Sequence, residues 1–289
     1  MSASPHPSVP NWPSVPNWLG GLISAARATD GQPPFSDQSL VDLRAGTRRL
    51  LAISEVAAAI VSPTEAELVV IPDARGRGHG SALVSTIVSS AQPGFLVWAH
   101  GDHPAARALA ARYGFEPVRR LLQLRLTLPE FIEPADISIG PIRLPADIPE
   151  WLALNARAFA HHPEQGSVTR DDLDGIMAEP WFDASAFLVM REGEGEGDRM
   201  IGYCWLKVEH DVGELYVVGV DPAYQGRGIG RQLVEAGLAE LAHRGVRESS
   251  LYVEADNEPA LKLYTSLGYT EYSVDIQYAL TRFTPRSHG

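Results

Sequence analysis

Two glycine-rich turns, half the chain apart, constrain the fold of this sequence more than any other feature. They occupy residues 75–80 and 225–230, and each lies between an apolar run typical of a strand and a run with helical periodicity. A glycine turn that opens a helix directs several backbone N–H groups toward one point, which suits a pyrophosphate. The turns are 150 residues apart (225 − 75 = 150) in a chain of 289 residues, which predicts a duplicated anion-binding domain.

The composition fits a globular protein with two domains. A hydrophobic content of 45% and a charged content of 21% are typical of that class. The formal charge of −12 argues against nucleic-acid or membrane partners, which need a basic face. No apolar run is long enough to span a membrane, and prolines interrupt the N-terminus before the core of a signal peptide develops. We therefore expect a cytoplasmic protein, and a monomer is the simplest expectation.

The side chains that commonly bind metals do not form a recognisable set. Cys204 is the only cysteine, which excludes an intrachain disulfide and a zinc site built from cysteines. His161 and His162 are adjacent in a loop-like segment, and no third ligand stands at a metal-site spacing. We expect no metal.

The chain divides at its proline-rich segments. Residues 1–18 contain the sequence PSVPNW twice, and proline at that density favours an extended, disordered tail. Residues 129–141 hold three prolines and one glycine without a helical period, which indicates a linker. The expected domains are residues 19–128 and 142–289.

Hydrophobic periodicity predicts the same order of elements in both domains, and hence a mixed α/β fold. Ser36 is a candidate N-cap, and Gly114 and Gly268 suit the position that ends a helix. Helices are predicted at 19–26, 36–43, 81–90 and 104–112, and at 148–160, 170–177, 229–243 and 259–267. Strands are predicted at 49–56, 67–71, 95–99 and 121–128, and at 186–190, 200–209, 214–220 and 249–254.

The order of strand, glycine turn, helix, strand, Asn257-x-x-Ala260, helix and Gly268-Tyr269 resembles the GCN5-related N-acetyltransferases. That resemblance implies two tandem domains, each with a mixed sheet that splays after the strand preceding the turn. Acetyl-CoA would enter the split, with its pyrophosphate on the amides of the turn. The likeness covers roughly residues 19–280 and is tighter in the second half.

A tandem of this kind, with the segments 213–222, 251–257 and 272–280, resembles the group of the family that makes mycothiol. It implies acetyl transfer from acetyl-CoA to the cysteinyl amine of Cys-GlcN-Ins. Two alternatives stay open: acetylation of a protein N-terminus or another small amine, and a CoA-binding protein without turnover. Retention of Glu214 and Tyr264 argues against the second.

Glu214 is the candidate general base. Side chains alternate along a strand, so Glu214, Tyr216, Val218 and Val220 are expected on one face, upstream of the turn. A carboxylate there can take a proton from the incoming ammonium. Tyr264 is the candidate general acid, because the family places a tyrosine on this helix beside the departing sulfur.

The family also implies the contacts to the cofactor. In the second half these are Val218, Gly219, Val220, Gln225, Gly226, Arg227, Gly228, Ile229, Gly230, Arg231, Asn257, Glu258 and Lys262. The matching residues in the first half are Leu68, Val69, Val70, Arg75, Gly76, Arg77, Gly78, His79 and Gly80.

The first half differs at the catalytic positions. With the offset of 150 residues Glu214 falls on Thr64, and with the offset of 154 between Gly114 and Gly268, Tyr264 falls on Ala110. Glu65 and Glu67 are near, so a slip of one residue would restore a carboxylate. We expect the first domain to bind CoA at most and to be inactive.

An aminosugar and an inositol need carboxylates and a lysine that bind hydroxyl groups. By resemblance the contacts would come from Asp37, Glu164, Lys207, Glu214 and Tyr252. Asp37 stands where the family leads us to expect a glutamate.

Overall fold

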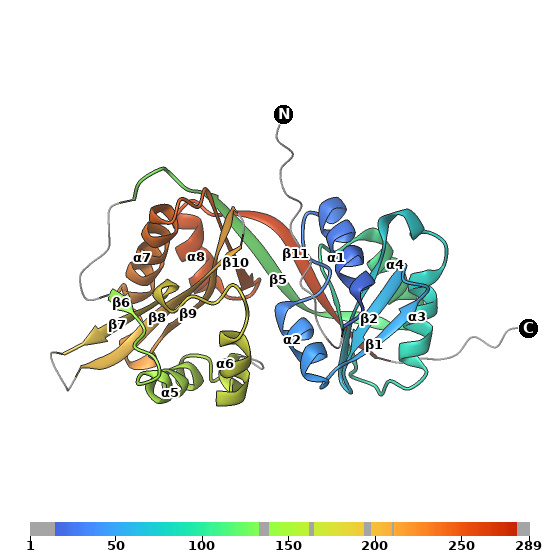
Figure 1. The fold of residues 1–289 in the computed structure, drawn as a ribbon, viewed down its shortest axis with the longest axis horizontal. Coiled ribbons are helices and arrows are strands. Elements are labelled where there is room, and N and C mark those ends of the chain that lie inside the picture. The colour runs from blue at the N-terminus through green and yellow to red at the C-terminus, as the bar shows by residue number, and fades with distance from the viewer. Residues whose placement is uncertain (1–14, 133–138, 162–164, 194–197, 210, 282–289) are drawn as a thin grey trace, which may run out of the picture. The chain divides into compact units, whose positions relative to one another are not determined.

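The computed structural model describes residues 15–132, 139–161, 165–193, 198–209 and 211–281 (Figure 1). The chain forms two compact units that are not contiguous in sequence. Unit 1 takes residues 1–122, 254–256 and 273–289, and unit 2 takes residues 123–253 and 257–272. The contiguous domains 19–128 and 142–289 stay a prediction. Most of the expected tail and the middle of the expected linker lie outside the described residues.

Unit 1 is a sheet with helices on both faces. Alternate residues of its central strands enter two separate cores, one with Ala58 and Ile60, the other with Ala57 and Ala59. The first core packs under α1 (Asn17–Asp30) and α2 (Asp37–Ala45), and the second under α3 (His79–Val88) and α4 (Pro104–Tyr113). The strand order is β1 (Arg49–Ile53), β2 (Ala57–Val61), β3 (Glu65–Val70), β4 (Leu96–Ala99), then parts of β11 (Thr270–Leu280) and β5 (Phe115–Thr127).

Local sequence signals set the limits of these elements. The Ser36 hydroxyl accepts a hydrogen bond from Ser39 N at 3.2 Å, so the predicted N-cap of α2 is confirmed. Gly114 ends α4 with φ of +78°, also as predicted. The strand predicted at 49–56 is present as β1 but ends at Ile53, because the chain turns at Ser54 and Glu55 and returns as β2, which was not predicted. All five residues of β2 are buried, so the strand lacks the alternation that would reveal it.

Unit 2 repeats the plan. Its strand order is β6 (Ile139–Pro141), β7 (Phe187–Glu192), β8 (Arg199–Glu209), β9 (Val212–Val220), β10 (Glu248–Glu254) and part of β5. Trp151 of α5 (Ile148–Ala158) and Leu173 of α6 (Arg170–Met177) pack with Trp205 on one face. Cys204 and Leu206, on the other face of β8, meet α7 (Ile229–His243) at Gly237.

The unit is completed by α8 (Glu258–Ser266), which follows β10. The predicted limits of α6 and α7 are confirmed to the residue. Strand β6 occupies the end of the expected linker and pairs with β7, which the sequence did not predict. The turn expected between β7 and β8 lies partly outside the described residues, at 194–197. Among the described residues, no helix is both long enough and apolar enough to cross a membrane.

Candidate functional site

The two glycine turns share one backbone conformation. Each joins a short 3-10 helix, η1 (Pro72–Ala74) or η5 (Pro222–Tyr224), to the helix that follows. The φ angles are +76° and +81° at Gly226 and Gly228, and +74° and +89° at Gly76 and Gly78. Residues with a side chain rarely adopt such angles, so glycine is required there. Both turns are exposed and present the N-terminal amides of α7 and α3 to solvent, as an anion site requires.

The first side chain of each turn reaches back to the strand before it. Arg75 Nε donates to Val70 O at 3.1 Å, and Gln225 Nε2 donates to Val220 O at 3.4 Å. Asp221, which begins the approach to the second turn, accepts hydrogen bonds from Arg157 and from Ala223 N. These bonds fix the turns relative to the strands that a bound cofactor would follow.

Each sheet splays beside its glycine turn. Strand β9 pairs with β10 only over residues 212–214, and β3 pairs with β4 only over residues 65–67. From Leu215 to Val220, and from Leu68 to Val70, these parallel partners are absent within the described chain. At these open edges the backbone groups of β9 and β3 are not used by a parallel neighbour. The resemblance to the acetyltransferases predicts that the arm of the cofactor binds there.

A β-bulge in β9 changes which side chains accompany Glu214. Trp205 pairs with Val217 and Leu206 pairs with Leu215, so Tyr216 is an extra residue on β9. Glu214 and Tyr216 therefore share the face of the aromatic core, but Val218 and Val220 lie on the α7 face. The expectation that all four share one face is wrong, because the bulge reverses the alternation.

The same bulge shows which residue of unit 1 matches Glu214. Strand β3 pairs with β2 without a bulge, so removal of Tyr216 from the alignment places Glu214 on Glu65, not Thr64. The pairing with the next strand supports the same alignment. Glu65 pairs with Leu96 and Glu214 pairs with Ser250, and Leu96 and Ser250 are related by the offset of 154 residues. Unit 1 thus keeps a carboxylate at this place. It is ion-paired with Arg48, with Nη2 and Oε1 2.5 Å apart.

Tyr264 lies on α8 with 9% of its surface exposed. Its ring packs edge-on against the Tyr269 ring, with the ring centroids 5.8 Å apart. The Tyr269 hydroxyl forms a hydrogen bond with Ser249 Oγ. The Tyr264 hydroxyl makes no hydrogen bond to a described residue. Burial raises the pKa of Tyr264 above its ordinary value, so the phenol stays protonated at neutral pH. A protonated, unshared phenol is able to donate to a sulfur.

Two of the predicted substrate contacts lie on the strands around Glu214. Lys207 pairs with Glu214 across β8 and β9, and its ammonium lies 2.9 Å from Glu209 and 5.1 Å from the Trp181 ring. Tyr252, on β10, accepts a hydrogen bond from Gln123 Nε2 at 2.8 Å. The structure therefore brings Lys207 next to Glu214.

Of the other two predicted substrate contacts, one belongs to unit 1 and one lies outside the described residues. Asp37 is the first residue of α2 in unit 1, directly after the N-cap. Glu164 lies outside the described residues.

The predicted cofactor contacts on α8 have local partners. The Asn257 side chain caps the helix by accepting from Ala260 N at 3.2 Å. Glu258 and Lys262 pair with each other at 3.2 Å, and both are more than three-quarters exposed. In the second turn, Arg227 lies over the Tyr224 ring. Arg231, in the first turn of α7, contacts Ser266 of α8 and Glu235 of its own helix. In the first turn, Arg77 is exposed and His79 begins α3.

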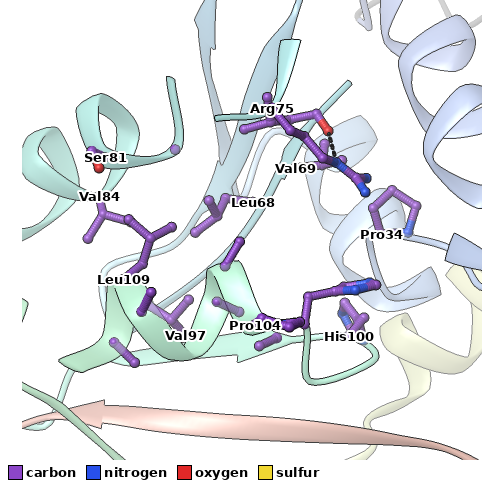
Figure 2. A pocket seen from close by; sticks show the side chains of 18 of the residues that line it. Pro34, Leu68, Val69, Arg75, Ser81, Val84, Val97, His100, Pro104 and Leu109 are labelled. Carbon is purple, nitrogen blue, oxygen red and sulfur yellow. Dashed lines mark hydrogen bonds between the residues drawn. The ribbon is translucent and has the colours of Figure 1, made fainter. Parts of the chain in front are cut away.

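Unit 1 contains a cavity of about 710 Å³ between β3, β4, α3 and α4. Its lining includes the predicted Leu68, Val69 and Val70 and most of the first glycine turn. Figure 2 shows Val84, Val97 and Leu109 close together at the lower left of the cavity, with Arg75 and His100 farther to the right. The volume and the mainly apolar lining are those of a small-molecule site.

A buried charged network beside this cavity was missed by the sequence analysis. His100 Nδ1 lies 2.8 Å from Asp275 Oδ2, and its Nε2 lies 3.6 Å from Glu67 Oε2. Glu67 also accepts hydrogen bonds from Ser36 and Ser39. The partners are up to 175 residues apart in the chain, and no local pattern connects them.

The charges of this network hold one another in the ionised state. Burial lowers the pKa of His100, but the hydrogen bond with Asp275 and the charge of Glu67 raise it to about 10. Burial likewise raises the pKa of Glu67, and the His100 and Ser36 contacts outweigh this and lower it to about 2. Among the described residues, no group of three or more His, Cys, Asp or Glu side chains is arranged to hold a metal ion.

Comparison with known proteins identifies a family match and several relatives of this chain. The Acetyltransferase (GNAT) family matches residues 150–269. A mycothiol acetyltransferase of Clavibacter sepedonicus is 46% identical over 278 residues, which cover 89% of each chain. One of Thermomonospora curvata is 45% identical over 89% of this chain and 91% of its own. One of Kocuria rhizophila is 39% identical over 96% of this chain and 99% of its own.

Solved structures share the fold. A GCN5-related N-acetyltransferase from Sphaerobacter thermophilus has a TM-score of 0.64 at 20% identity, covering 92% of this chain and 93% of that chain. A tandem GNAT protein from the clavulanic acid biosynthesis pathway has a TM-score of 0.63 at 16% identity, covering 91% and 93%. With the mixed sheets described above, these likenesses confirm the predicted tandem α/β fold.

Proposed function

This chain belongs to the mycothiol acetyltransferase family of GNAT proteins, and we propose that it acetylates the cysteinyl amine of Cys-GlcN-Ins to give mycothiol and CoA. The observation that carries this proposal is identity of 39–46% to relatives of that name over about nine-tenths of the chain. The enzyme is an acyltransferase. Acetyl-CoA supplies the acetyl group as a thioester, whose carbonyl carbon is open to attack by an amine.

The residues of unit 2 fit such a cofactor. The second glycine turn offers amides for the pyrophosphate. Among the described residues, the edge of β9 from Val218 to Val220 has no parallel partner that would block the arm. In our proposal the Val220 N–H donates to the thioester carbonyl, where negative charge grows during attack. The remaining cofactor contacts are those predicted from the sequence, from Gln225 to Arg231 and at Asn257, Glu258 and Lys262.

Glu214 and Tyr264 move the protons in this proposal. The Glu214 carboxylate takes a proton from the substrate ammonium, directly or through one water, and so frees the lone pair that attacks. A C–N bond forms and the C–S bond breaks. The Tyr264 phenol then gives its proton to the departing sulfur, for which its burial and its free hydroxyl suit it. The second proton that the nitrogen loses on becoming an amide leaves through solvent, from which the phenolate of Tyr264 regains one.

The substrate proposal assigns the hydroxyl contacts to Asp37, Glu164, Lys207 and Tyr252, with Glu214 at the amine. The direct pairing of Lys207 with Glu214 across the ladder of β8 and β9 supports two of these five assignments. We also propose that the protein works as a cytoplasmic monomer, without nucleic-acid or membrane partners, which its formal charge of −12 supports.

Mass spectrometry of reaction mixtures tests the substrate. The full chain is incubated with acetyl-CoA and either Cys-GlcN-Ins or peptides with free N-terminal amines. We expect one added acetyl group on the cysteinyl nitrogen of Cys-GlcN-Ins and none on the peptides. Acetylated peptides with unchanged Cys-GlcN-Ins would overturn the proposal in favour of a protein N-terminal acetyltransferase.

For unit 1 we propose a CoA site without turnover. The support is a cavity lined by Leu68, Val69 and Val70, a turn with the same φ angles as in unit 2, and Ala110 in place of a tyrosine. The ion pair of Glu65 with Arg48 also disfavours a role as base. Native mass spectrometry is expected to show two CoA molecules per chain, and a maximum of one would contradict this part.

A further inference from the structure

The helices α4 and α8 approach their own glycine turns in the same way. A methyl group built on Gly80 would lie 3.2 Å from Leu109 Cδ1, and one on Gly230 would lie 3.9 Å from Leu263 Cδ2. Leu109 and Leu263 are related by the same offset of 154 residues as Gly114 and Gly268. The residues that follow them, Ala110 and Tyr264, therefore occupy equivalent places within their units.

Unit 2 fills this place with two aromatic rings. Tyr264 packs edge-on against Tyr269, and both side chains are buried. The equivalents in unit 1 are Ala110 and Phe115, so one entire phenol ring is missing. Both of these residues line the 710 Å³ cavity. The space that Tyr264 occupies in unit 2 is thus part of a hollow in unit 1.

The hollow extends into the hydrophobic core of unit 1. Its walls include apolar side chains that belong to the core cluster of unit 1 or pack against it, contributed by α3, β4, α4, β5 and β11: Val84, Val97, Leu109, Ala110, Phe115 and Tyr278. Figure 2 shows three of them, Val84, Val97 and Leu109, together on the side of the cavity away from His100. We use the name acyl pouch for this set of six residues.

We propose that unit 1 binds an acyl-CoA whose acyl chain is longer than acetyl, with the chain in the acyl pouch and the pyrophosphate on the first glycine turn. The inference rests on the CoA site proposed for unit 1. In unit 2 the phenol of Tyr264 is assigned to the sulfur, so the pouch begins where a thioester would lie. An apolar chain there would gain dispersion contacts with the apolar side chains that line the pouch.

The pouch predicts a dependence on chain length. Each methylene moved from water to an apolar site tightens binding by about fourfold, until the pouch is full. In unit 2 the ring of Tyr264 occupies the equivalent place, so the gain in affinity is expected at one of the two sites only. A medium-length chain such as hexanoyl is therefore the expected ligand class of unit 1, and acetyl that of unit 2.

Calorimetric titration of the full chain with acetyl-, butyryl- and hexanoyl-CoA, without an amine substrate, tests the proposal. Ala110→Phe returns a ring to the pouch, and Ala111→Phe is the matched control, since Ala111 is exposed on α4 and does not line the cavity. The wild type and Ala111→Phe should bind hexanoyl-CoA at one site at least tenfold more tightly than acetyl-CoA. Ala110→Phe should lose that gain.

Equal or falling affinity from acetyl to hexanoyl in the wild type would overturn the proposal, as would an undiminished gain in Ala110→Phe. The wild-type series decides the matter even if Ala110→Phe does not fold. A single CoA per chain by native mass spectrometry would instead refute the underlying CoA site in unit 1. Failure to acetylate Cys-GlcN-Ins concerns unit 2 and leaves this result intact.

Discussion

Glu214 is the residue on which the proposed proton transfer depends. It stands at the last pair of β9 with β10 and opposite Lys207, where the sheet begins to splay. Glu214→Gln keeps the shape of the side chain but cannot accept a proton. We expect kcat to fall by about a hundredfold or more, with acetyl-CoA affinity unchanged, in a coupled assay of CoA release.

Glu271→Gln is the control, since Glu271 is exposed and lies outside the proposed site. A Glu214→Gln enzyme that turns over at the wild-type rate would remove the base assignment.

Tyr264 and Tyr269 allow the acid role to be separated from packing. Tyr264→Phe keeps the edge-on ring contact and removes only the hydroxyl. We expect kcat to fall by roughly a hundredfold, because the sulfur must then leave without its proton donor. Tyr269→Phe removes the hydrogen bond to Ser249. It should lower Tm, with a much smaller loss of kcat than in Tyr264→Phe. Equal losses of kcat in both variants would indicate a packing role for Tyr264.

Among the elements, the helices are predictable from sequence and the register of β9 is not. Helices α6 and α7 have apolar periodicity and clear ends, so their limits follow from the chain. The bulge at Tyr216 adds one residue inside an apolar run, and nothing in that run distinguishes a bulged valine or tyrosine from a paired one. The identification of Glu65 as the counterpart of Glu214 therefore required the pairing of the strands.

The His100 network ties α2, β3, β4 and β11 together. His100→Gln would leave the Glu67 carboxylate buried without its counter-charge. We therefore expect the free energy of unfolding of unit 1 to fall by about 3 kcal/mol at pH 6. The pKa of His100 is raised to about 10 from 6.5, so its contribution is complete below pH 6.5 and is lost as the pH rises to 10. The pKa of Glu67 is lowered to about 2 from 4.5, so its contribution is lost as the pH falls from 4.5.

The measurement is urea unfolding of the wild type and His100→Gln at a series of pH values. Their difference in unfolding free energy should be largest between about pH 4.5 and 6.5 and should shrink on either side. His243→Gln, an exposed histidine of α7, is the control and should show little difference at any pH. A difference that does not vary with pH would mean that His100 contributes only packing.

At the scale of the whole molecule, the sequence predicts the duplication but not how the chain shares its strands. The paired turns and helix ends show two copies of one plan, and the linker suggests a clean division near residue 129. Strands β5 and β11 nevertheless each contribute to both units. The sequence of a strand does not specify which sheet it joins, because its apolar face fits any core with a matching pattern. Contacts between residues far apart in the sequence determine which unit each part of β5 and β11 joins.

Removal of residues 273–289 tests this exchange. The deletion removes Ile276–Ala279, which pair with β4, and Asp275, whose carboxylate contacts His100. These residues stand near the end of the chain, but their partners belong to its first half. We expect hydrogen exchange to show loss of protection in β4, α3 and α4, with protection retained in β7, β8 and α7. A chain ending at Thr281 keeps the strand and is the control. Loss of protection first in β7 to β9 would favour contiguous domains over the exchange of strands.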